Sequence, residues 1–180
     1  VIPPGRERVP SGRGVLAGEI MEYNSVVLAA QVRAWGGEVV RYAIVPDQLE
    51  AIVDAVQQAV EENDLVLLNA GSSAGAEDFS ACVVETVGRL LVHGVAVRPG
   101  HPVILGVAAR KQAPGWAVIV GVPGYPVSAA LTNEIFVEPL LAAWQGRRAQ
   151  QFYEVEAQLT RKLVSPAGDD DFVRVVAGRV

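Results

Sequence analysis

Hydrophobic residues recur at helical spacing in several stretches of the chain. Residues 24–35 and 49–61 each place apolar side chains along one face, which is typical of an amphipathic helix. Gly36-Gly37 ends the first of these as a C-terminal cap. A third helix is predicted over residues 78–88, and a fourth over residues 126–144.

Short apolar runs lie between these helices and predict strands. The runs are Val1-Ile2 and residues 38–45, 64–69, 91–97, 102–108 and 117–122. A continuously apolar run suits a strand that is covered on both faces. Strands that alternate with helices predict crossover connections. We therefore expect a three-layer α/β/α domain with a mostly parallel mixed sheet.

The C-terminal stretch has a different pattern. Residues 152–157 alternate between apolar and polar, and residues 172–176 are again strand-like, with no helix between them. We predict an α/β domain over residues 1–146, with its N-terminus truncated within its first strand. Residues 147–180 are expected to be a linker and the start of a C-terminal β-barrel-like domain.

Composition excludes several classes of protein. The 180 residues carry a net charge of −5 and no Lys/Arg cluster, which argues against nucleic acid as a partner. No apolar run reaches the roughly 18 residues that cross a membrane. One cysteine excludes an internal disulfide framework and indicates a cytoplasmic protein.

The strongest candidate site is the Gly/Ser-rich loop that follows residues 64–69. Its candidate binding residues are Gly71, Ser72, Ser73 and Gly75, and Asp78 follows them. Glycines let the backbone approach a ligand, and hydroxyl groups and the N–H groups of a helix start can hold phosphate. The alternative is a flexible connector that Asp78 ends as a helix cap. No Gly-Lys-[Ser/Thr] follows, so a nucleoside triphosphatase loses its main support.

Two further connections join strands to the next element. Arg98 and His101 lie in a turn stiffened by prolines and can donate to an anion, although a solvated Arg98 in a plain hairpin is an equal alternative. Residues 121–128 pass from a strand to a helix, with Pro126 at the first helical position. The candidate binding residues of that second connection are Pro123, Gly124, Pro126 and Ser128.

Three carboxylates are also expected at this edge of the sheet. Glu7 follows the first strand, Asp47 follows residues 38–45, and Asp78 follows the Gly/Ser loop. Clustered like charges are costly unless a cation or a proton resolves them, and Mg²⁺ would do so. The alternatives are that Asp47 is a helix cap and Glu7 a surface charge.

Four segments, taken in order, resemble the molybdopterin molybdotransferases (MoeA in bacteria, the E domain of gephyrin in animals) and the wider group with the MogA and MoaB fold. Residues 69–78 resemble the family's Ser-Gly-Gly-x-Ser-x-Gly-x-x-Asp loop. Residues 98–102 resemble its Lys-Pro-Gly-Lys-Pro turn, and residues 122–129 its Leu-Pro-Gly-Asn-Pro-Val-Ser-Ala segment. Residues 18–24 match its Gly-x-Ile-x-Asp-Ser-Asn segment at the start of a helix.

The resemblance implies molybdenum cofactor biosynthesis. A family member binds adenylylated molybdopterin and inserts molybdate into its dithiolene, with Mg²⁺-assisted release of AMP. It implies catalytic roles for Asp47, Asp78 and Glu7, with Asp47 and Asp78 as the Mg²⁺ ligands. It also implies a homodimer, contacts with other cofactor-biosynthesis proteins, and an enzyme that is incomplete as this fragment. Arg98 and His101 stand where lysines are usual.

Other functions remain open on the sequence. The main alternative is a molybdopterin- or nucleotide-binding module without chemistry, acting as a sensor, carrier or scaffold. A nucleotide pyrophosphatase of the same fold would turn over free dinucleotides without any pterin.

Overall fold

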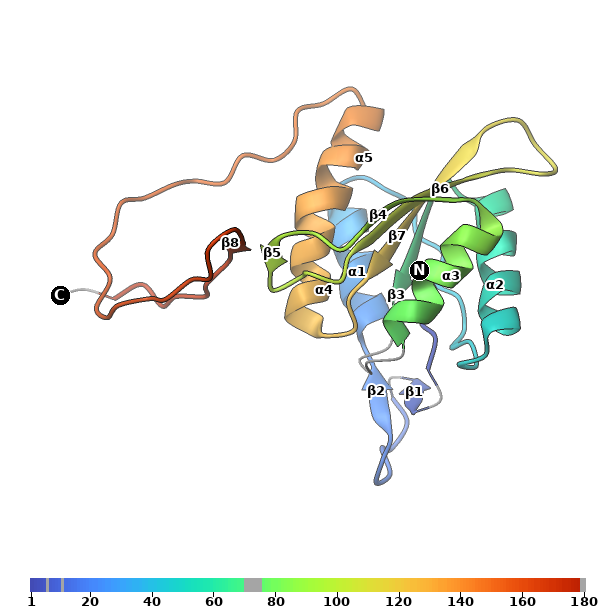
Figure 1. The fold of residues 1–180 in the computed structure, drawn as a ribbon, viewed down its shortest axis with the longest axis horizontal. Coiled ribbons are helices and arrows are strands. Elements are labelled where there is room, and N and C mark those ends of the chain that lie inside the picture. Colours follow the sequence, from blue (N-terminus) through green and yellow to red (C-terminus); the bar gives the residue numbers. More distant parts are fainter. Residues whose placement is uncertain (6, 11, 70–75, 179–180) are drawn as a thin grey trace.

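A four-stranded mixed sheet forms the middle layer of the domain (Figure 1). The computed structural model describes residues 1–5, 7–10, 12–69 and 76–178, without the side chains of 76–78. The strand order is β3 (Leu65–Asn69), β7 (Trp116–Val122), β6 (Ile104–Ala109) and β4 (Arg89–His93). β3 and β7 are parallel, whereas β6 is antiparallel to both β7 and β4.

Two N-terminal segments extend the parallel side of this sheet. Ile2 bridges Leu68 in parallel, and Pro4 bridges Val45 in parallel. The expected first strand is therefore present as a single bridge beside β3. The prediction of a regular, buried strand over residues 38–45 is wrong, because this segment forms only one bridge and its residues are half-buried or exposed. Among the described residues it lies outermost, beyond residues 1–5, and no further strand pairs with it there.

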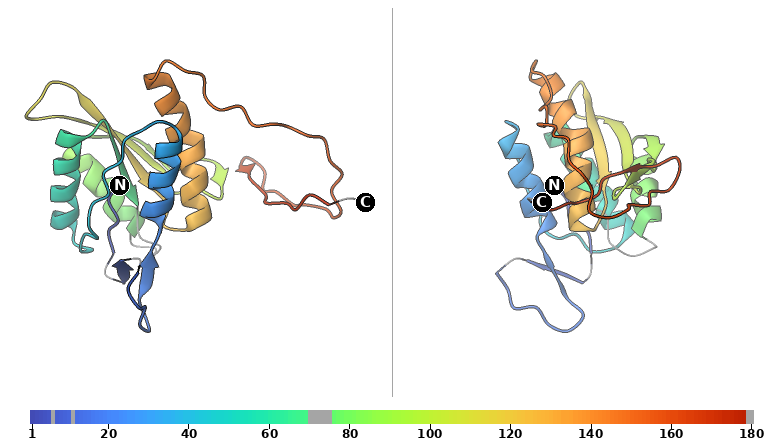
Figure 2. Two further views of the ribbon diagram at one scale, coloured as in Figure 1. Left: turned by 180° about the vertical axis from the view of Figure 1, so that it is seen from behind. Right: turned by 90° about the vertical axis from the view of Figure 1, so that its left-hand side faces the viewer.

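Helices cover both faces of the sheet, as predicted (Figure 2). α2 (Leu49–Glu62) and α3 (Ala76–Val87) share one apolar cluster with Val66 and Leu68 of β3. On the other face, α1 (Asn24–Ala34), α4 (Pro126–Thr132) and α5 (Glu138–Trp144) pack with Leu67. Successive side chains of β3 thus point to opposite faces of the sheet, as the two-residue period of a strand requires.

The fourth predicted helix contains an irregularity. A π-helical turn, η1 (Asn133–Val137), separates α4 from α5. The helix nevertheless runs from Pro126 to Trp144, as the sequence predicted. The predicted strand over 91–97 divides into β4 and the short β5 (Val97–Arg98).

A small arm projects from one end of the sheet. β1 (Arg8–Pro10) and β2 (Ile20–Glu22) pair in parallel, with Arg8 opposite Ile20. In Figure 1 the arm lies at the lower end of the molecule, and β2 leads directly into α1. The sequence pattern did not predict this pair of strands.

The C-terminal segment leaves α5 and returns to the domain at β5 (Figure 1). Among the described residues of this segment, only β8 (Asp170–Asp171) is a strand, and it pairs in parallel with β5. The strands predicted over 152–157 and 172–176 do not form, and both stretches are exposed. A strand needs a partner and an apolar face to cover it, and the described residues supply neither. Within the described ranges, no helix is long and apolar enough to cross a membrane.

Candidate functional site

The candidate loops meet at one edge of the sheet. β3 and β7 are parallel, so Asn69 and Val122 end at the same edge. The segments before Glu7 and Asp47 run parallel to β3 through their bridges, so both carboxylates follow strands that end there. Ile104 pairs with Gly121, which brings the β4–β6 connection to this edge as well. Ligands of open α/β sheets bind at such an edge.

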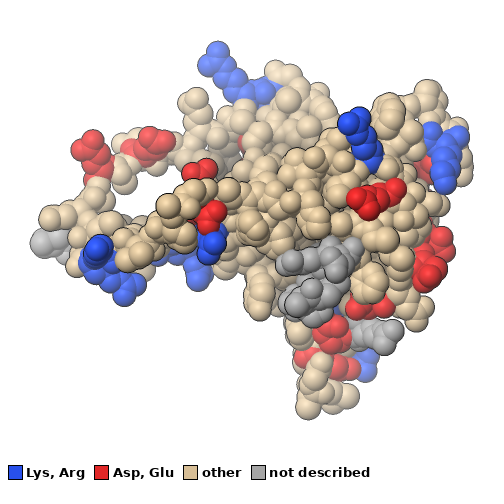
Figure 3. Space-filling model, viewed as in Figure 1, with Lys and Arg blue, Asp and Glu red and all other residues tan. Residues whose placement is uncertain are grey.

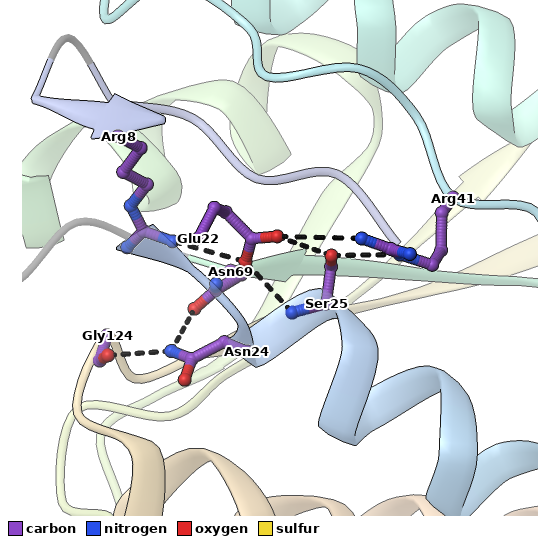
Figure 4. Close-up of polar contacts among 7 residues, drawn as sticks. All are labelled: Arg8, Glu22, Asn24, Ser25, Arg41, Asn69 and Gly124. Atoms are coloured by element: carbon purple, nitrogen blue, oxygen red, sulfur yellow. Dashed lines mark hydrogen bonds and ion pairs between the residues drawn. The ribbon is translucent and has the colours of Figure 1, made fainter. Parts of the chain in front are cut away.

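Asn24 ties three segments together at this edge (Figure 4). Its side-chain Nδ2 donates to the Gly124 carbonyl at 2.7 Å and to Oδ1 of Asn69 at 3.3 Å. Asn24 begins α1, Asn69 ends β3, and Gly124 lies between β7 and α4. The Nδ2 atom of Asn69 is buried and has no hydrogen-bond partner among the residues that the structure describes. The contact fixes the backbone of the Pro123–Ser128 connection against the sheet.

Glu22 carries a buried negative charge beside this contact. One carboxylate oxygen accepts from the Ser25 backbone N–H at 2.9 Å, and the other accepts from the Ser25 hydroxyl. The first bond satisfies a free N–H group in the first turn of α1. The guanidinium groups of Arg8 and Arg41 each lie 3.9 Å from the carboxylate, on either side of it (Figure 4).

Arg8 is the buried cation of this cluster. Its side chain is 7% exposed. Burial lowers the pKa of Arg8 below its usual value, while the negative charges of Glu22, Glu7 and Asp47 act in the opposite direction. The structure therefore brings Glu7 and Asp47, both predicted from the sequence, into the field of one guanidinium.

Two cavities open beside Arg8 and Glu22. The smaller, of about 40 Å³, is lined by Glu7, Arg8, Ile20, Met21, Glu22, Tyr23, Asn24 and Gly124. The larger, of about 470 Å³, is lined by Pro3, Arg8, Pro10, Glu22, Arg41, Tyr42, Ala43 and Ile44. Figure 3 shows acidic side chains gathered at this end of the molecule.

Much of the Gly/Ser loop lies outside the described residues. These are Gly71, Ser72, Ser73 and Gly75. Asp78 belongs to α3, but its side chain is likewise outside them. The binding and catalytic roles of this loop therefore stay predictions.

Arg98 makes its ion pair away from the carboxylate cluster. Its guanidinium is 55% exposed and pairs with Asp169 of the C-terminal segment. The Arg98 carbonyl also accepts from the Phe172 N–H at 2.6 Å. Arg98-Pro99 is a cis peptide bond, and His101 is exposed. The turn thus presents donors to solvent, which is compatible with the predicted anion contact and does not test it.

The β7–α4 connection places its predicted residues differently. Pro126 opens α4, as expected from the sequence. Gly124 lines the smaller cavity, whereas Ser128 is buried against the domain. Tyr125 and Val127 are the exposed side chains of this connection and face solvent.

The described carboxylates do not fit a resident Mg²⁺. Within the described ranges, no three His, Cys, Asp or Glu residues are placed to hold a metal ion. Glu7 and Asp47 instead share the field of the Arg8 guanidinium. The part of the metal prediction that depends on Asp78 lies outside the described side chains.

Sequence reasoning missed the residues that organise this edge. Arg8, Arg41 and Ser25 belong to no motif, and their positions give no local signal. Asn24 and Asn69 did have a signal, because they stand at the start of a helix and the end of a strand within segments of the resemblance. A lone asparagine at such a position is usually a cap or a turn residue, so neither was predicted to organise the site.

Comparison with known proteins agrees with this geometry. Residues 3–143 match the family model described as a probable molybdopterin binding domain. The chain is 31% identical over 175 residues to a molybdopterin molybdenumtransferase from Haemophilus influenzae, covering 97% of this chain and 42% of that protein. It is 32% identical over 165 residues to the same-named protein from Synechococcus elongatus, covering 90% and 40% respectively.

Solved structures show the same similarity. The molybdopterin biosynthesis MoeA protein from Pyrococcus horikoshii superposes with a TM-score of 0.70 at 32% identity, covering 81% of this chain and 34% of that one. MoaB from Thermus thermophilus, at 22% identity and a TM-score of 0.55, shares the fold. The resemblance seen in the four sequence segments is thereby confirmed, and this chain belongs to the family of molybdopterin-binding domains.

Proposed function

We propose that this chain is the molybdopterin-binding domain of a molybdenum insertase that acts in molybdenum cofactor biosynthesis. The chain spans about two fifths of the two curated relatives, at 42% and 40% of their lengths. The observation that carries the proposal is the convergence of the strand ends on one edge, locked by the Asn24 contacts to Asn69 and Gly124.

The substrate of the proposed reaction is adenylylated molybdopterin together with molybdate. Water attacks the phosphoanhydride, the phosphorus–oxygen bond breaks, and AMP leaves while the pterin keeps its own phosphate. Molybdate then exchanges oxygen for the two dithiolene sulfurs, and the displaced oxygen leaves as water. In this proposal Glu7, Asp47 and Asp78 orient the attacking water and take its proton.

The remaining site residues hold the substrate. The Gly/Ser loop (Gly71, Ser72, Ser73 and Gly75) and the N–H groups after it would bind the pterin phosphate. Arg98 and His101 would contact the anionic groups from the β4–β6 connection. We further propose a cytoplasmic homodimer that exchanges its pterin with other cofactor-biosynthesis proteins.

Substitution of Asn24 tests the binding part of this proposal. Asn24→Ala removes the donor of the buried Asn69 Oδ1 and of the half-buried Gly124 carbonyl. We therefore expect molybdopterin to bind about tenfold more weakly, or about 1.4 kcal/mol. Asn63→Ala is the matched control, since Asn63 bonds to the Ala59 carbonyl and lies before β3, at its other end. Fluorescence titration with molybdopterin measures both variants. Equal affinity in Asn24→Ala and the native chain would remove this edge as the binding site.

Asp78 tests the catalytic part. We expect Asp78→Ala to abolish AMP release from adenylylated molybdopterin while the pterin still binds. If AMP release survives, the catalytic role of this loop is wrong. If the native protein binds pterin and releases no AMP at all, the chain is the binding module that the sequence left as the alternative.

A further inference from the structure

The C-terminal segment returns to the domain beside the turn that carries Arg98 (Figure 1). β8 pairs in parallel with β5, so that Asp171 lies opposite Arg98. The carboxylate of Asp169 contacts the Arg98 guanidinium. Residues 169–172, which we call the acidic segment, thus bring three successive aspartates to the arginine that the sequence predicts to bind an anion.

The attachment of the acidic segment is local and weak. The Asp170 N–H donates to the Ala96 carbonyl at 2.8 Å, and the Phe172 N–H donates to the Arg98 carbonyl at 2.6 Å. A pair of strands this short is only marginally stable in water. The ion pair between Arg98 and Asp169 adds little, because the Arg98 side chain is 55% exposed. The acidic segment can therefore open while the domain stays folded.

The aspartates of the acidic segment are not equivalent. Since successive side chains of a strand alternate between its two faces, Asp169 and Asp171 lie on the side of Arg98, and Asp170 lies on the other side. The Asp169 side chain is 16% exposed against the guanidinium, whereas Asp170 is exposed. Asp169 therefore stands where an anionic ligand of Arg98 would stand, and Asp170 carries the same charge without that position.

The chain between α5 and the acidic segment forms a tether. The Gln150 N–H donates to Glu138 of α5 at 3.0 Å, which fixes the near end of the tether. Residues 151–168 are exposed throughout and lead to Asp169. A group on such a tether competes with a free ligand at an effective concentration on the order of millimolar. A free anion must overcome this local concentration to bind Arg98.

We propose that the acidic segment is an intramolecular competitor for the anion site at Arg98. Asp169 holds the guanidinium in the free protein, and an anionic ligand displaces Asp169 and opens the pairing of β5 with β8. The inference rests on the proposed function, in which Arg98 contacts the anionic groups of the substrate. A phosphate group carries more charge and more acceptor oxygens than one carboxylate, so the acidic segment selects for phosphate-bearing ligands over singly charged anions.

Amide hydrogen exchange at Phe172 measures the opening of the acidic segment, because this N–H donates to the Arg98 carbonyl. The probe is inorganic pyrophosphate added to the full chain, and sodium acetate at equal ionic strength is its control. We expect pyrophosphate to accelerate the exchange at Phe172 at least about threefold more than acetate does. In Arg98→Ala we expect rapid exchange at Phe172 that pyrophosphate no longer changes.

Asp169→Asn tests the competition itself. Calorimetric titration with pyrophosphate should show that this variant binds the anion about three- to fivefold more tightly than the native chain, since an exposed ion pair contributes an effect of that size. Asp170→Asn is the matched control. It makes the same change of charge in the same segment and should keep the native affinity for pyrophosphate.

The two results together support the proposal. Equal pyrophosphate affinity in Asp169→Asn and Asp170→Asn would overturn it, and so would exchange at Phe172 that pyrophosphate and acetate change alike. Pyrophosphate contains no pterin, so such a failure leaves molybdopterin binding, tested with Asn24→Ala, untouched. Conversely, the test with Asn24→Ala can fail while the competition at Arg98 is observed.

Discussion

Two arginine–carboxylate contacts in this domain use the same chemistry in opposite surroundings. Arg8 and Glu22 are 7% and 3% exposed, whereas Arg98 and Asp169 are 55% and 16% exposed. The first pair joins the two strands of the arm, β1 and β2, next to the start of α1, and the second joins β5 to the C-terminal segment. Burial makes the first pair a fixed part of the site, because removal of one partner leaves the charge of the other buried and uncompensated. Exposure to solvent makes the second ion pair weak, so that a charged ligand can readily replace Asp169 as the partner of Arg98.

The comparison distinguishes two sides of the candidate site, the Glu22 side and the Arg98 side. The Glu22 side is preorganised, since Ser25, Arg41 and Arg8 all contact one carboxylate. The Arg98 side has a rigid turn but an exposed side chain that can leave Asp169 for an anionic ligand. We infer that the Glu22 side contributes to pterin affinity through its fixed shape, and that the Arg98 side contributes through its positive charge.

The largest expected effect comes from breaking the buried contact. Glu22→Ala removes the carboxylate that lies 3.9 Å from the buried Arg8 guanidinium and that accepts from the Ser25 N–H. We expect a loss of about 3–5 kcal/mol in the free energy of unfolding, measured by urea denaturation. Glu19→Ala, which removes the exposed pair with Arg13, should cost about 0–1 kcal/mol. Equal unfolding midpoints for the two variants would erase the distinction between the buried and the exposed pair.

The exposed contact should behave in the opposite way. Arg98→Ala and Asp169→Asn are each expected to change the free energy of unfolding by about 1 kcal/mol or less, and less still at high salt. Arg98→Ala should nevertheless weaken molybdopterin binding. A double-mutant cycle between the two residues, run at low and high salt, measures the coupling. A coupling as large as that between Glu22 and Arg8 would place the buried and the exposed pair in one class.

The smallest expected effect is a pH dependence of amide exchange where the C-terminal segment leaves α5. A hydrogen bond from Arg147 holds the pKa of buried Glu138 below its usual value. The folded state therefore favours the ionised form, and this stabilisation is present above the unfolded pKa of about 4.3 and is lost as the pH falls through the lowered value. Amide exchange at Gln150, whose N–H donates to Glu138 at 3.0 Å, should rise in that acidic range.

Glu138→Gln provides the control for this prediction. It removes the titrating group and should give faster exchange at Gln150 that no longer changes over the same pH range. Unchanged exchange at Gln150 in the native chain down to that range would contradict the role of Glu138 as an anchor.

The order of elements followed from local patterns. The helices at 24–35, 49–61 and 78–88 agree with the structure to within two residues, because amphipathic spacing alone specifies them. The four strands of the sheet were found from their continuously apolar runs, and the loops after β3 and β7 converge because these two strands are parallel. The strands predicted at 152–157 and 172–176 failed because alternation shows only that a strand is possible, and a strand also needs a partner.

The sequence by itself determined the fold class, the family and the segments that follow the strands, since each depends on neighbouring residues read together. Only the tertiary structure decided how that edge is charged. Arg8, Glu22 and Arg41 come from separate segments, and they form one cluster because β1 pairs with β2 and residues 40–45 lie beside residues 1–5. Contacts between such distant segments leave no pattern among neighbouring residues, so the sequence could not predict them.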